Sequence, residues 1–239
     1  MAILLVNSSL QLSFSLSISQ VEIDVLHKIY NDTRGNEWDW GNYDPYFVLW
    51  SFNTTNQRDP CADHNATGAL QRWKGVRCND TTVECSKANI SCTVTDFNLH
   101  QNNMVGTLTS EIVKLKNLVR LHLDGNKIFG SLPSTLSEMT QLTHIDSYNN
   151  SFTGTLPDIS KLVHLEHLNL GNNKMTGSLS PHIGCLATLT VIDVVSNKFT
   201  GTIPDSFGDL LGLQYLYLET NKFSGSIPSS LGKLKGKNS

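Results

Sequence analysis

Charged residues and long apolar runs are both scarce in this sequence of 239 residues. Charged side chains make up 16% of the chain, against roughly 25% in an average soluble domain. No window approaches the roughly 18 uninterrupted apolar residues of a membrane-spanning helix. The formal net charge is −3, so the chain lacks the excess of basic groups that attracts nucleic acids and acidic membranes. We therefore expect no membrane span and no nucleic-acid partner.

Cysteine pairs at the CxxC spacing of metal sites are also absent. Four cysteines instead lie close together, at Cys61, Cys78, Cys85 and Cys92. Glycosylation sequons surround them or follow them, at Asn31, Asn53, Asn65, Asn79, Asn89 and Asn149. Such a cluster is typical of a disulfide framework in an oxidising, secretory compartment. We expect an extracellular or cell-surface protein, although four cysteines allow three connectivities.

Residues 1–19 have two interpretations. The stretch carries no charge, and Ser17 and Ser19 are placed like the small residues of a signal-peptidase site, which favours a cleaved signal peptide. The alternation of Leu10, Leu12 and the apolar residues after them predicts an N-terminal strand or arm instead. Ser19 and Glu22 also form the S-x-x-E pattern that opens a helix.

From residue 94 onward the sequence is periodic. An asparagine recurs every 23 or 24 residues, a glycine follows four residues later, and Leu or Ile comes two residues after the glycine. A typical unit is LVRLHLDGNKIFGSLPSTLSEMTQ, residues 118–141. The recurring asparagines are Asn102, Asn126, Asn150, Asn173, Asn197 and Asn221.

Each column of this repeat has a physical role in a stack of coils. Leu121 and Leu123 face inward from a short strand, while His122 between them faces outward. Each recurring asparagine lies where the chain leaves the strand, so its amide can pair backbone groups that would otherwise be buried unpaired. Gly130 permits a turn with positive φ. One unit leaves both of its flat faces apolar, so neighbouring units must stack.

These columns resemble the plant-type leucine-rich repeat, LxxLxxLxLxxNxLxGxIPxxLxxL. The resemblance implies a right-handed superhelical α/β solenoid with a parallel β-sheet on the concave face and 3₁₀ or helical turns on the convex face. A second short strand precedes the proline in that family. We divide the chain into a signal peptide or arm (1–19), an N-terminal cap (20–93), six repeats (94–234) and a basic tail without a C-terminal cap (235–239).

The region before the repeats resembles the N-terminal cap of the same family. An amphipathic helix comes first, formed by Val21, Val25, Leu26 and Ile29. Tryptophans and a DPC…WxGVxC element follow, the latter at residues 59–61 and 73–78. On this resemblance we favour the bridges Cys61–Cys78 and Cys85–Cys92.

The register of the repeats assigns the side chains that face outward from the concave sheet. They combine four histidines and three tyrosines with five carboxylates against one arginine, a net charge near −4 when histidine is neutral. We name them the candidate ligand-binding residues: Asp96, His100, Arg120, His122, Asp124, His144, Asp146, Tyr148, His167, Asp193, Tyr215, Tyr217 and Glu219. His144 and His167 share a column on adjacent strands, so their backbones should lie about 5 Å apart.

Three interpretations of this face stay open. The histidines and aspartates can be solvated surface. They can form a groove for a protein or a cell-wall or surface glycan, whose affinity rises as the histidines protonate below about pH 6.5. They can bind a metal through His144, His167 and Asp146, although zinc needs at least three converging ligands. Our assignment includes no metal and no cofactor.

Enzyme motifs are missing from the chain. GxSxG, HExxH and P-loop patterns do not occur, and the glycines follow the repeat period. Asp124 and Asp146 could act on a glycosidic bond in principle. Carboxylates on an open sheet, however, should lack the burial that raises the pKa of a catalytic acid. We therefore expect a non-catalytic protein.

Cys185 and the last repeat offer possible contacts between molecules. Cys185 aligns with Glu138 and Asp209 of other units, where side chains should face solvent. We expect a partly covered free thiol, with an intermolecular bridge as the alternative. Solenoids need polar terminal caps, so the apolar edge of the last repeat either meets another subunit or further repeats, or belongs to a last turn that simply frays. That edge comprises Leu216, Leu218, Ile227 and Leu231.

The repeats resemble those of receptor-kinase ectodomains and polygalacturonase-inhibiting proteins. This resemblance implies a secreted or cell-surface glycoprotein that binds protein or glycan partners through its concave face. The alternative is a structural subunit of an extracellular fibre or surface coat that assembles through the solenoid ends. A fold by itself does not identify the ligand.

Overall fold

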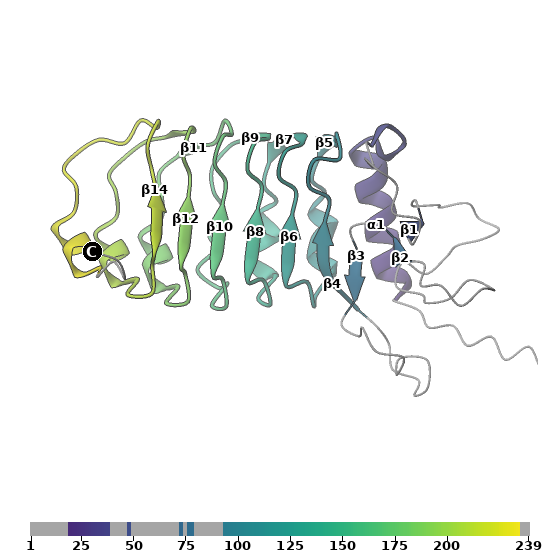
Figure 1. Ribbon diagram of the computed structural model, residues 1–239, viewed down its shortest axis with the longest axis horizontal. Helices are drawn as coiled ribbons and strands as arrows, with labels where there is room; N and C mark the ends of the chain where they lie inside the picture. Colours follow the sequence, from purple (N-terminus) through teal and green to yellow (C-terminus); the bar gives the residue numbers. More distant parts are fainter. Residues whose placement is uncertain (1–18, 39–46, 49–71, 74–75, 79–92, 235–239) are drawn as a thin grey trace, which may run out of the picture.

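The computed structural model describes residues 19–38, 47–48, 72–73, 76–78 and 93–234, and most of them form a row of stacked coils (Figure 1). Several of the expectations above lie outside the described residues. They concern residues 1–18, the tail 235–239, Cys61, Cys85, Cys92, Asn53, Asn65, Asn79 and Asn89. Within the described ranges, no helix combines the length and the apolar character that crossing a bilayer demands.

One sheet runs along the whole row of coils. In spatial order its strands are β14 (Tyr215–Tyr217), β12 (Val191–Asp193), β10 (His167–Asn169), β8 (His144–Asp146), β6 (Arg120–His122), β4 (Val94–Asn98) and β3 (Val76–Cys78). All neighbours pair in parallel except β3, which pairs antiparallel with β4. The expected solenoid with a parallel sheet is confirmed, and β3 adds an antiparallel strand at the end nearest the cap.

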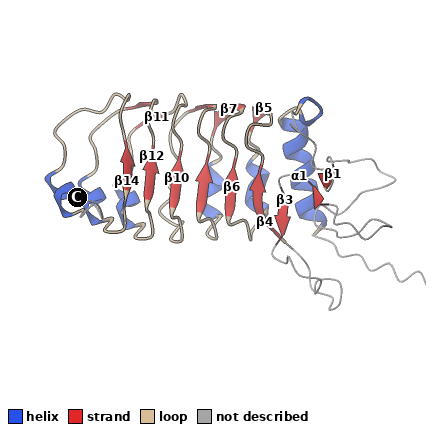
Figure 2. Ribbon diagram, in the orientation of Figure 1, coloured by secondary structure: helices blue, strands red, loops and turns tan. Residues whose placement is uncertain are grey.

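Short second strands and 3₁₀ turns complete the coils (Figure 2). The second strands are β5 (Val105–Thr107), β7 (Lys127–Ser131), β9 (Ser151–Thr153), β11 (Thr176–Gly177) and β13 (Lys198–Phe199). The 3₁₀ turns are η2 (Ser110–Lys114), η3 (Ser134–Glu138), η4 (Pro181–Cys185), η5 (Asp205–Asp209) and η6 (Ser229–Lys233). Before the row lie η1 (Gly35–Glu37) and the paired strands β1 (Phe47–Val48) and β2 (Arg72–Trp73).

The core lies between the main sheet and the 3₁₀ turns. Leu121 and Leu123 are fully buried on the sheet side, and Leu136 meets them from η3. Gly130, near the end of the second strand β7, has φ 82°, a conformation that glycine adopts at little cost. The alternation of buried and exposed positions along each strand therefore follows the leucine columns of the sequence.

An asparagine amide links each coil to the one before it. Oδ1 of Asn126 accepts hydrogen bonds from the N–H groups of Asn102 (3.0 Å) and Met104 (2.9 Å). Its Nδ2 donates to the carbonyls of Leu99 and Leu123, each at 2.8 Å. The same bonding to the preceding coil recurs at Asn150, Asn173, Asn197 and Asn221. The asparagine amides therefore form one continuous row along the axis of the solenoid.

Helix α1 (Gln20–Asp32) covers the first coil (Figure 1). Its capping box is confirmed, because the Ser19 hydroxyl accepts from the Glu22 N–H and the Glu22 carboxylate accepts from the Ser19 N–H. Oε1 of Glu22 also accepts from the N–H of Val94 at 3.0 Å. At the other end of the helix, the Val105 N–H donates to the Thr33 carbonyl at 3.1 Å.

The buried stripe of α1 differs from the expected one at its first position. Val21 is 50% exposed, whereas Glu22 is only 4% exposed and lies beside Val25, Leu26 and Ile29. Residues 22, 25, 26 and 29 follow the i, i+3, i+4, i+7 spacing of one helix face. A carboxylate can occupy this face because its hydrogen bonds to Ser19 and Val94 replace those to water.

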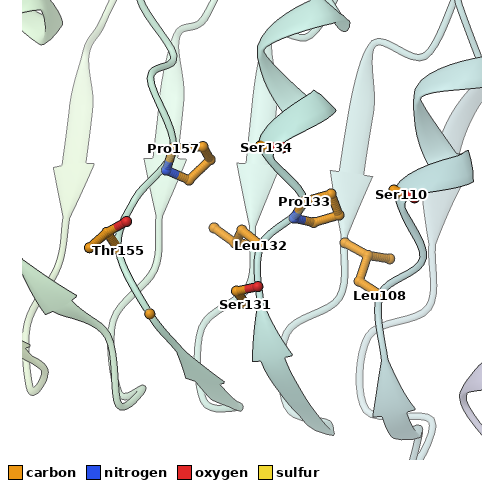
Figure 3. Close-up of a pocket in the computed structure, with 9 residues that line it drawn as sticks. Leu108, Ser110, Ser131, Leu132, Pro133, Ser134, Thr155 and Pro157 are labelled. Carbon is orange, nitrogen blue, oxygen red and sulfur yellow. The ribbon is translucent and has the colours of Figure 1, made fainter.

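The repeat is interrupted at its third coil. The interval from Asn150 to Asn173 is one residue shorter than the others. In the described chain no 3₁₀ turn lies between η3 and η4. The strands β9 and β11 do not pair with each other, and an isolated bridge between Thr155 and Thr176 takes the place of that pairing. An open groove of about 650 Å³ lies beside this break (Figure 3). Its lining includes Leu108, Leu132, Pro133, Thr155 and Pro157.

Ser147 is a second irregularity of the same coil. It occupies the core position that Leu99, Leu123 and Leu170 hold in other coils, three residues before the ladder asparagine. Ser147 is fully buried, and its hydroxyl oxygen has no hydrogen-bond partner. An unpaired buried polar group of this kind costs about 1–3 kcal/mol.

Removing one amide of the ladder should destabilise the stack. The substitution Asn126→Ala leaves the N–H of Met104 and the carbonyl of Leu99 without their side-chain partner, so we expect the free energy of unfolding to fall by about 2 kcal/mol or more. Urea denaturation followed by circular dichroism measures the change. Asn117→Ala, at an exposed position, is the control and should stay within about 0.5 kcal/mol. Equal effects of the two variants would contradict the role of the amide.

Removing the hydroxyl of Ser147 should have the opposite effect. Ser147→Ala deletes an unpaired buried oxygen, so we expect the free energy of unfolding to rise by about 1 kcal/mol. The same denaturation measurement applies, with Ser178→Ala at an exposed site as the matched control. A loss of stability in Ser147→Ala would mean that the hydroxyl has a partner.

Candidate functional site

The outward side chains of the main sheet form three columns that run along the row of coils. The first column contains Asp96, Arg120, His144, His167, Val191 and Tyr215. The second contains Asn98, His122, Asp146, Asn169, Asp193 and Tyr217. The third lies two residues beyond the second and contains His100, Asp124, Tyr148, Gly171, Val195 and Glu219. All thirteen candidate ligand-binding residues lie in these columns.

Three histidines of this face stack on one another. His144 and His167 lie opposite in register, with ring centroids 5.7 Å apart and planes at 14°. The His122 ring lies 6.3 Å from that of His144. Burial is the main cause that lowers the pKa of His122 and of His144. The charges of Asp146 and Asp124 oppose this lowering at His122, whereas the His167 imidazole adds to it at His144. These two rings therefore stay neutral to a lower pH than an exposed histidine, and any pH-dependent affinity that they confer stays a prediction.

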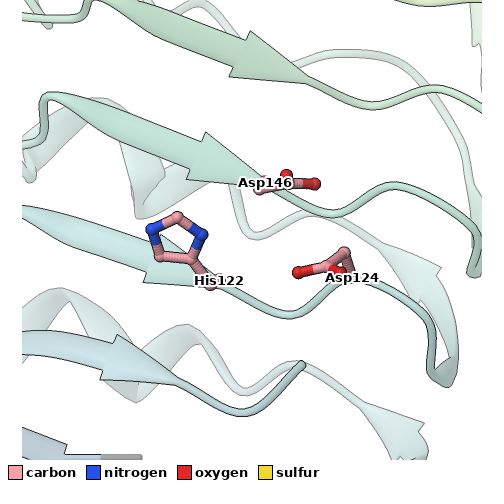
Figure 4. A group of neighbouring side chains, drawn as sticks. All are labelled: His122, Asp124 and Asp146. Carbon is pink, nitrogen blue, oxygen red and sulfur yellow. The ribbon is translucent and has the colours of Figure 1, made fainter. Parts of the chain in front are cut away.

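One histidine and two aspartates come together next to this stack (Figure 4). His122 on β6 lies opposite Asp146 on β8, and Asp124 follows His122 by two residues. One ligand atom from each of the three lies within 4.8 Å of the others. Among the described residues, no other three His, Cys, Asp or Glu side chains bring their ligand atoms this close together. The alternative metal site formed by His144, His167 and Asp146 therefore has no support in the geometry.

The carboxylate of Asp124 is less solvated than the sequence led us to expect. Burial, and next the charge of Asp146, raise its pKa above the ordinary value. The argument that carboxylates on this sheet lack the burial to shift their pKa is therefore wrong for Asp124. The expectation of a non-catalytic protein stays a prediction.

The single arginine of the concave face is already paired. Nη1 of Arg120 lies 2.8 Å from Oδ1 of Asp96 on the neighbouring strand β4. The other four carboxylates of the face, on Asp124, Asp146, Asp193 and Glu219, form no salt bridge in the part of the chain that the structure describes. The face therefore carries unpaired negative charge from its centre to its last coil.

Exposed tyrosines mark the end of the face near the last coil. Tyr215 and Tyr217 are 53% and 41% exposed, with ring centroids 6.2 Å apart and planes at 15°. Glu219 is exposed beside them. Rigid aromatic side chains with a polar tip are frequent anchors of protein interfaces.

The other predicted positions are distributed over the surface. Cys185 is free and exposed at the end of η4, so the expectation of a partly covered thiol is wrong. Asn31 and Asn149 are both exposed. In the last coil, Ile227 is 77% exposed, whereas Leu216, Leu218 and Leu231 are partly buried.

The group of His122, Asp124 and Asp146 is the feature that sequence reasoning missed. The register of the repeat places His122 opposite Asp146, and this spacing was visible in the sequence. Whether the ligand atoms of the three residues come close together also depends on the directions of their side chains, and the repeat spacing does not predict these directions.

Comparison with known proteins identifies the repeats. The family model described as Leucine Rich Repeat matches residues 117–139, 164–186, 188–210 and 212–234. Receptor-like protein kinase 7 of Arabidopsis thaliana is 35% identical over 106 residues, which cover 42% of this chain and 10% of that protein. The chain therefore matches about a tenth of the length of this curated relative.

Solved structures show the same architecture. The Arabidopsis receptor kinase HAESA, in complex with the peptide hormone IDA and the co-receptor SERK1, is 30% identical with a TM-score of 0.56, over 59% of this chain and 24% of that chain. The ectodomain of the receptor kinase SOBIR1 from Arabidopsis thaliana has a TM-score of 0.67 at 22% identity, over 89% of this chain and 99% of that chain. The second likeness concerns the fold alone.

Replacing Asp193 should stabilise the protein at neutral pH. Burial, mainly, raises the pKa of Asp193, so ionisation of this carboxyl opposes folding. That cost is absent below the ordinary carboxyl pKa and complete above the raised folded pKa. In the parent, the Val195 N–H donates to Oδ1 of Asp193 at 2.9 Å, and the amide oxygen of the Asp193→Asn variant can accept the same hydrogen bond. We expect the Tm of the variant to exceed that of the parent at about pH 7 and to match it at about pH 3. Thermal unfolding across this range is the measurement, and a lower Tm for the variant at neutral pH would contradict the assignment.

Proposed function

Because this chain is built from leucine-rich repeats of the plant receptor type, we propose that it is an extracellular recognition module that binds a peptide or protein partner on its concave face. The binding is non-catalytic. The observation that carries the proposal is the exposed pair Tyr215 and Tyr217 at one end of a continuous, negatively charged sheet surface.

The charges of the face favour a basic partner. Arg120 is paired with Asp96, and the remaining carboxylates are available to Lys or Arg side chains of a ligand. Complementary charge increases the rate of encounter and the specificity, while buried aromatic anchors contribute most of the affinity. An extended basic peptide along the columns would contact the acidic centre and the tyrosine end together.

The relatives support a peptide or protein ligand rather than a glycan. The HAESA structure contains a peptide hormone and a co-receptor, and the similarity of its repeats to those of this chain reaches 30% identity. A cell-wall or surface glycan is therefore the alternative outcome of the test below. Binding of a second protein chain to the same solenoid is compatible with this proposal.

An extracellular location agrees with the surface sequons. Asn31 and Asn149 are exposed and accessible for glycosylation, and the curated relative is a receptor-like kinase. The bridges Cys61–Cys78 and Cys85–Cys92 and the cleavage of residues 1–19 remain predictions of the same proposal. Assembly into a fibre or coat through the last coil also stays a prediction, for which the exposure of Ile227 and Leu211 is the relevant observation.

Truncation of the two tyrosines should weaken ligand binding. The full chain is tested against a library of short synthetic peptides of graded net charge and against neutral and acidic cell-wall oligosaccharides. We expect basic peptides to bind, and the double substitution Tyr215→Ala/Tyr217→Ala to weaken binding by about 30-fold or more, since truncating one hot-spot tyrosine costs about 2 kcal/mol.

Phe129→Ala is the matched control for this experiment. Phe129 is an exposed aromatic residue on β7, outside the main sheet, so its loss should leave the affinity unchanged. Binding of oligosaccharides in the absence of peptide binding would overturn the proposal in favour of a glycan ligand. Equal losses for the tyrosine and Phe129 variants would remove the concave face as the binding surface.

A further inference from the structure

The geometry of the concave face points to a site that the recognition function does not require. We propose that His122, Asp124 and Asp146 bind one divalent transition-metal ion, with zinc preferred. The three side chains come from two adjacent coils and lie side by side on the main sheet (Figure 4). The site does not depend on the identity of a peptide partner.

The donor atoms of the group match zinc and its neighbours better than calcium or magnesium. One imidazole nitrogen and two carboxylate oxygens form a set that Zn²⁺ and similar transition-metal ions bind well. Three protein ligands leave at least one coordination position for water or for a group of a bound molecule. Calcium takes six to eight oxygens and magnesium a nearly ideal octahedron of oxygens, which two aspartates and a histidine do not supply.

The distances are compatible with coordination after small side-chain movements. Ligand atoms around a tetrahedral zinc with bonds of about 2.1 Å lie about 3.4 Å apart, and those of the three residues lie within 4.8 Å of one another. All three residues are only partly buried, so rotation about their side-chain torsions can close this difference, which is at most about 1.4 Å. The backbone of the sheet need not move.

The hydrogen bonds around the group leave its ligand atoms accessible. Oδ1 of Asp146 accepts from the Tyr148 N–H at 3.0 Å, which orients the carboxylate and leaves Oδ2 for the metal. The same hydrogen bond occurs in three other residues of this column, where Oδ1 accepts from the N–H two residues further along the chain: Asn98, Asn169 and Asp193. At residue 122 of this column, a histidine imidazole stands in place of the Asn or Asp side chain that makes this hydrogen bond in the neighbouring coils.

The charge of the group favours a cation. Asp124 and Asp146 carry like charges, and a ligand atom of one lies within 4.8 Å of a ligand atom of the other, so the two carboxylates repel each other. The other ionisable groups that act on the three residues are His100, His144, Arg120 and Asp193. Arg120 already pairs with Asp96 at 2.8 Å, so it does not neutralise the two carboxylates. A bound dication would replace the repulsion by attraction.

Isothermal titration of the full chain with zinc chloride alone tests the proposal. The experiment uses the Cys185→Ser background, because an exposed thiolate also binds zinc. We expect saturable binding of one ion at neutral pH, with calcium and magnesium much weaker. Each of His122→Gln, Asp124→Asn and Asp146→Asn should weaken zinc binding by about 10-fold or more, since each removes one of three ligands.

Matched controls come from the same face. His167→Gln and Asp193→Asn change the same residue types in neighbouring coils and should retain the affinity of the parent. Zinc should raise the Tm of the parent and of the controls by mass action, and should leave the Tm of the three ligand variants unchanged. Circular dichroism without metal confirms that each variant is folded.

Three results would overturn the proposal. The first is no saturable zinc binding by the folded parent. The second is zinc binding that survives all three ligand substitutions, which would place the ion elsewhere. The third is equal weakening in the ligand variants and the controls, or equal affinity for calcium, either of which would indicate diffuse attraction to an acidic surface.

Discussion

Every coil of this solenoid depends on the pairing of backbone groups at the point where the chain leaves the main sheet. The turn there buries N–H and C=O groups inside the stack, and each unpaired buried group would cost about 1–3 kcal/mol. An asparagine meets this constraint because one amide carries both a donor and an acceptor. It bridges its own coil and the preceding one. The interval between asparagines therefore sets the strand register, and the register decides which outward side chains share a column.

The register also explains the different character of successive parts of the concave face. Near the cap, Arg120 lies opposite Asp96 and neutralises it. In the next part, His122 lies opposite Asp146 without a paired cation in the described residues. At the last coil, the columns end in tyrosines. One sheet surface thus places a potential cation site beside the acidic and aromatic groups suited to a basic peptide.

The sequence-based expectations that were wrong share one cause, which is the degree of burial. Val21 was expected in the stripe of α1, but Glu22 is buried there because its carboxylate accepts two backbone hydrogen bonds. Asp124 was expected to be solvated, but packing against its neighbours raises its pKa. Cys185 was expected to be partly covered, but it is exposed. Residue type indicates average burial, whereas the actual burial depends on neighbouring segments.

The sequence alone determined the stacking of the coils, the parallel sheet and the opposition of His144 and His167, because each column states a local requirement that recurs at a nearly constant interval. The resemblance to a known repeat added the second strands and the 3₁₀ turns. Only the tertiary structure decided that the ligand atoms of His122, Asp124 and Asp146 converge and that the hydroxyl of Ser147 is unpaired. A repeat interval specifies which backbone positions lie opposite one another, while the directions and solvation of side chains are set by packing between neighbouring coils.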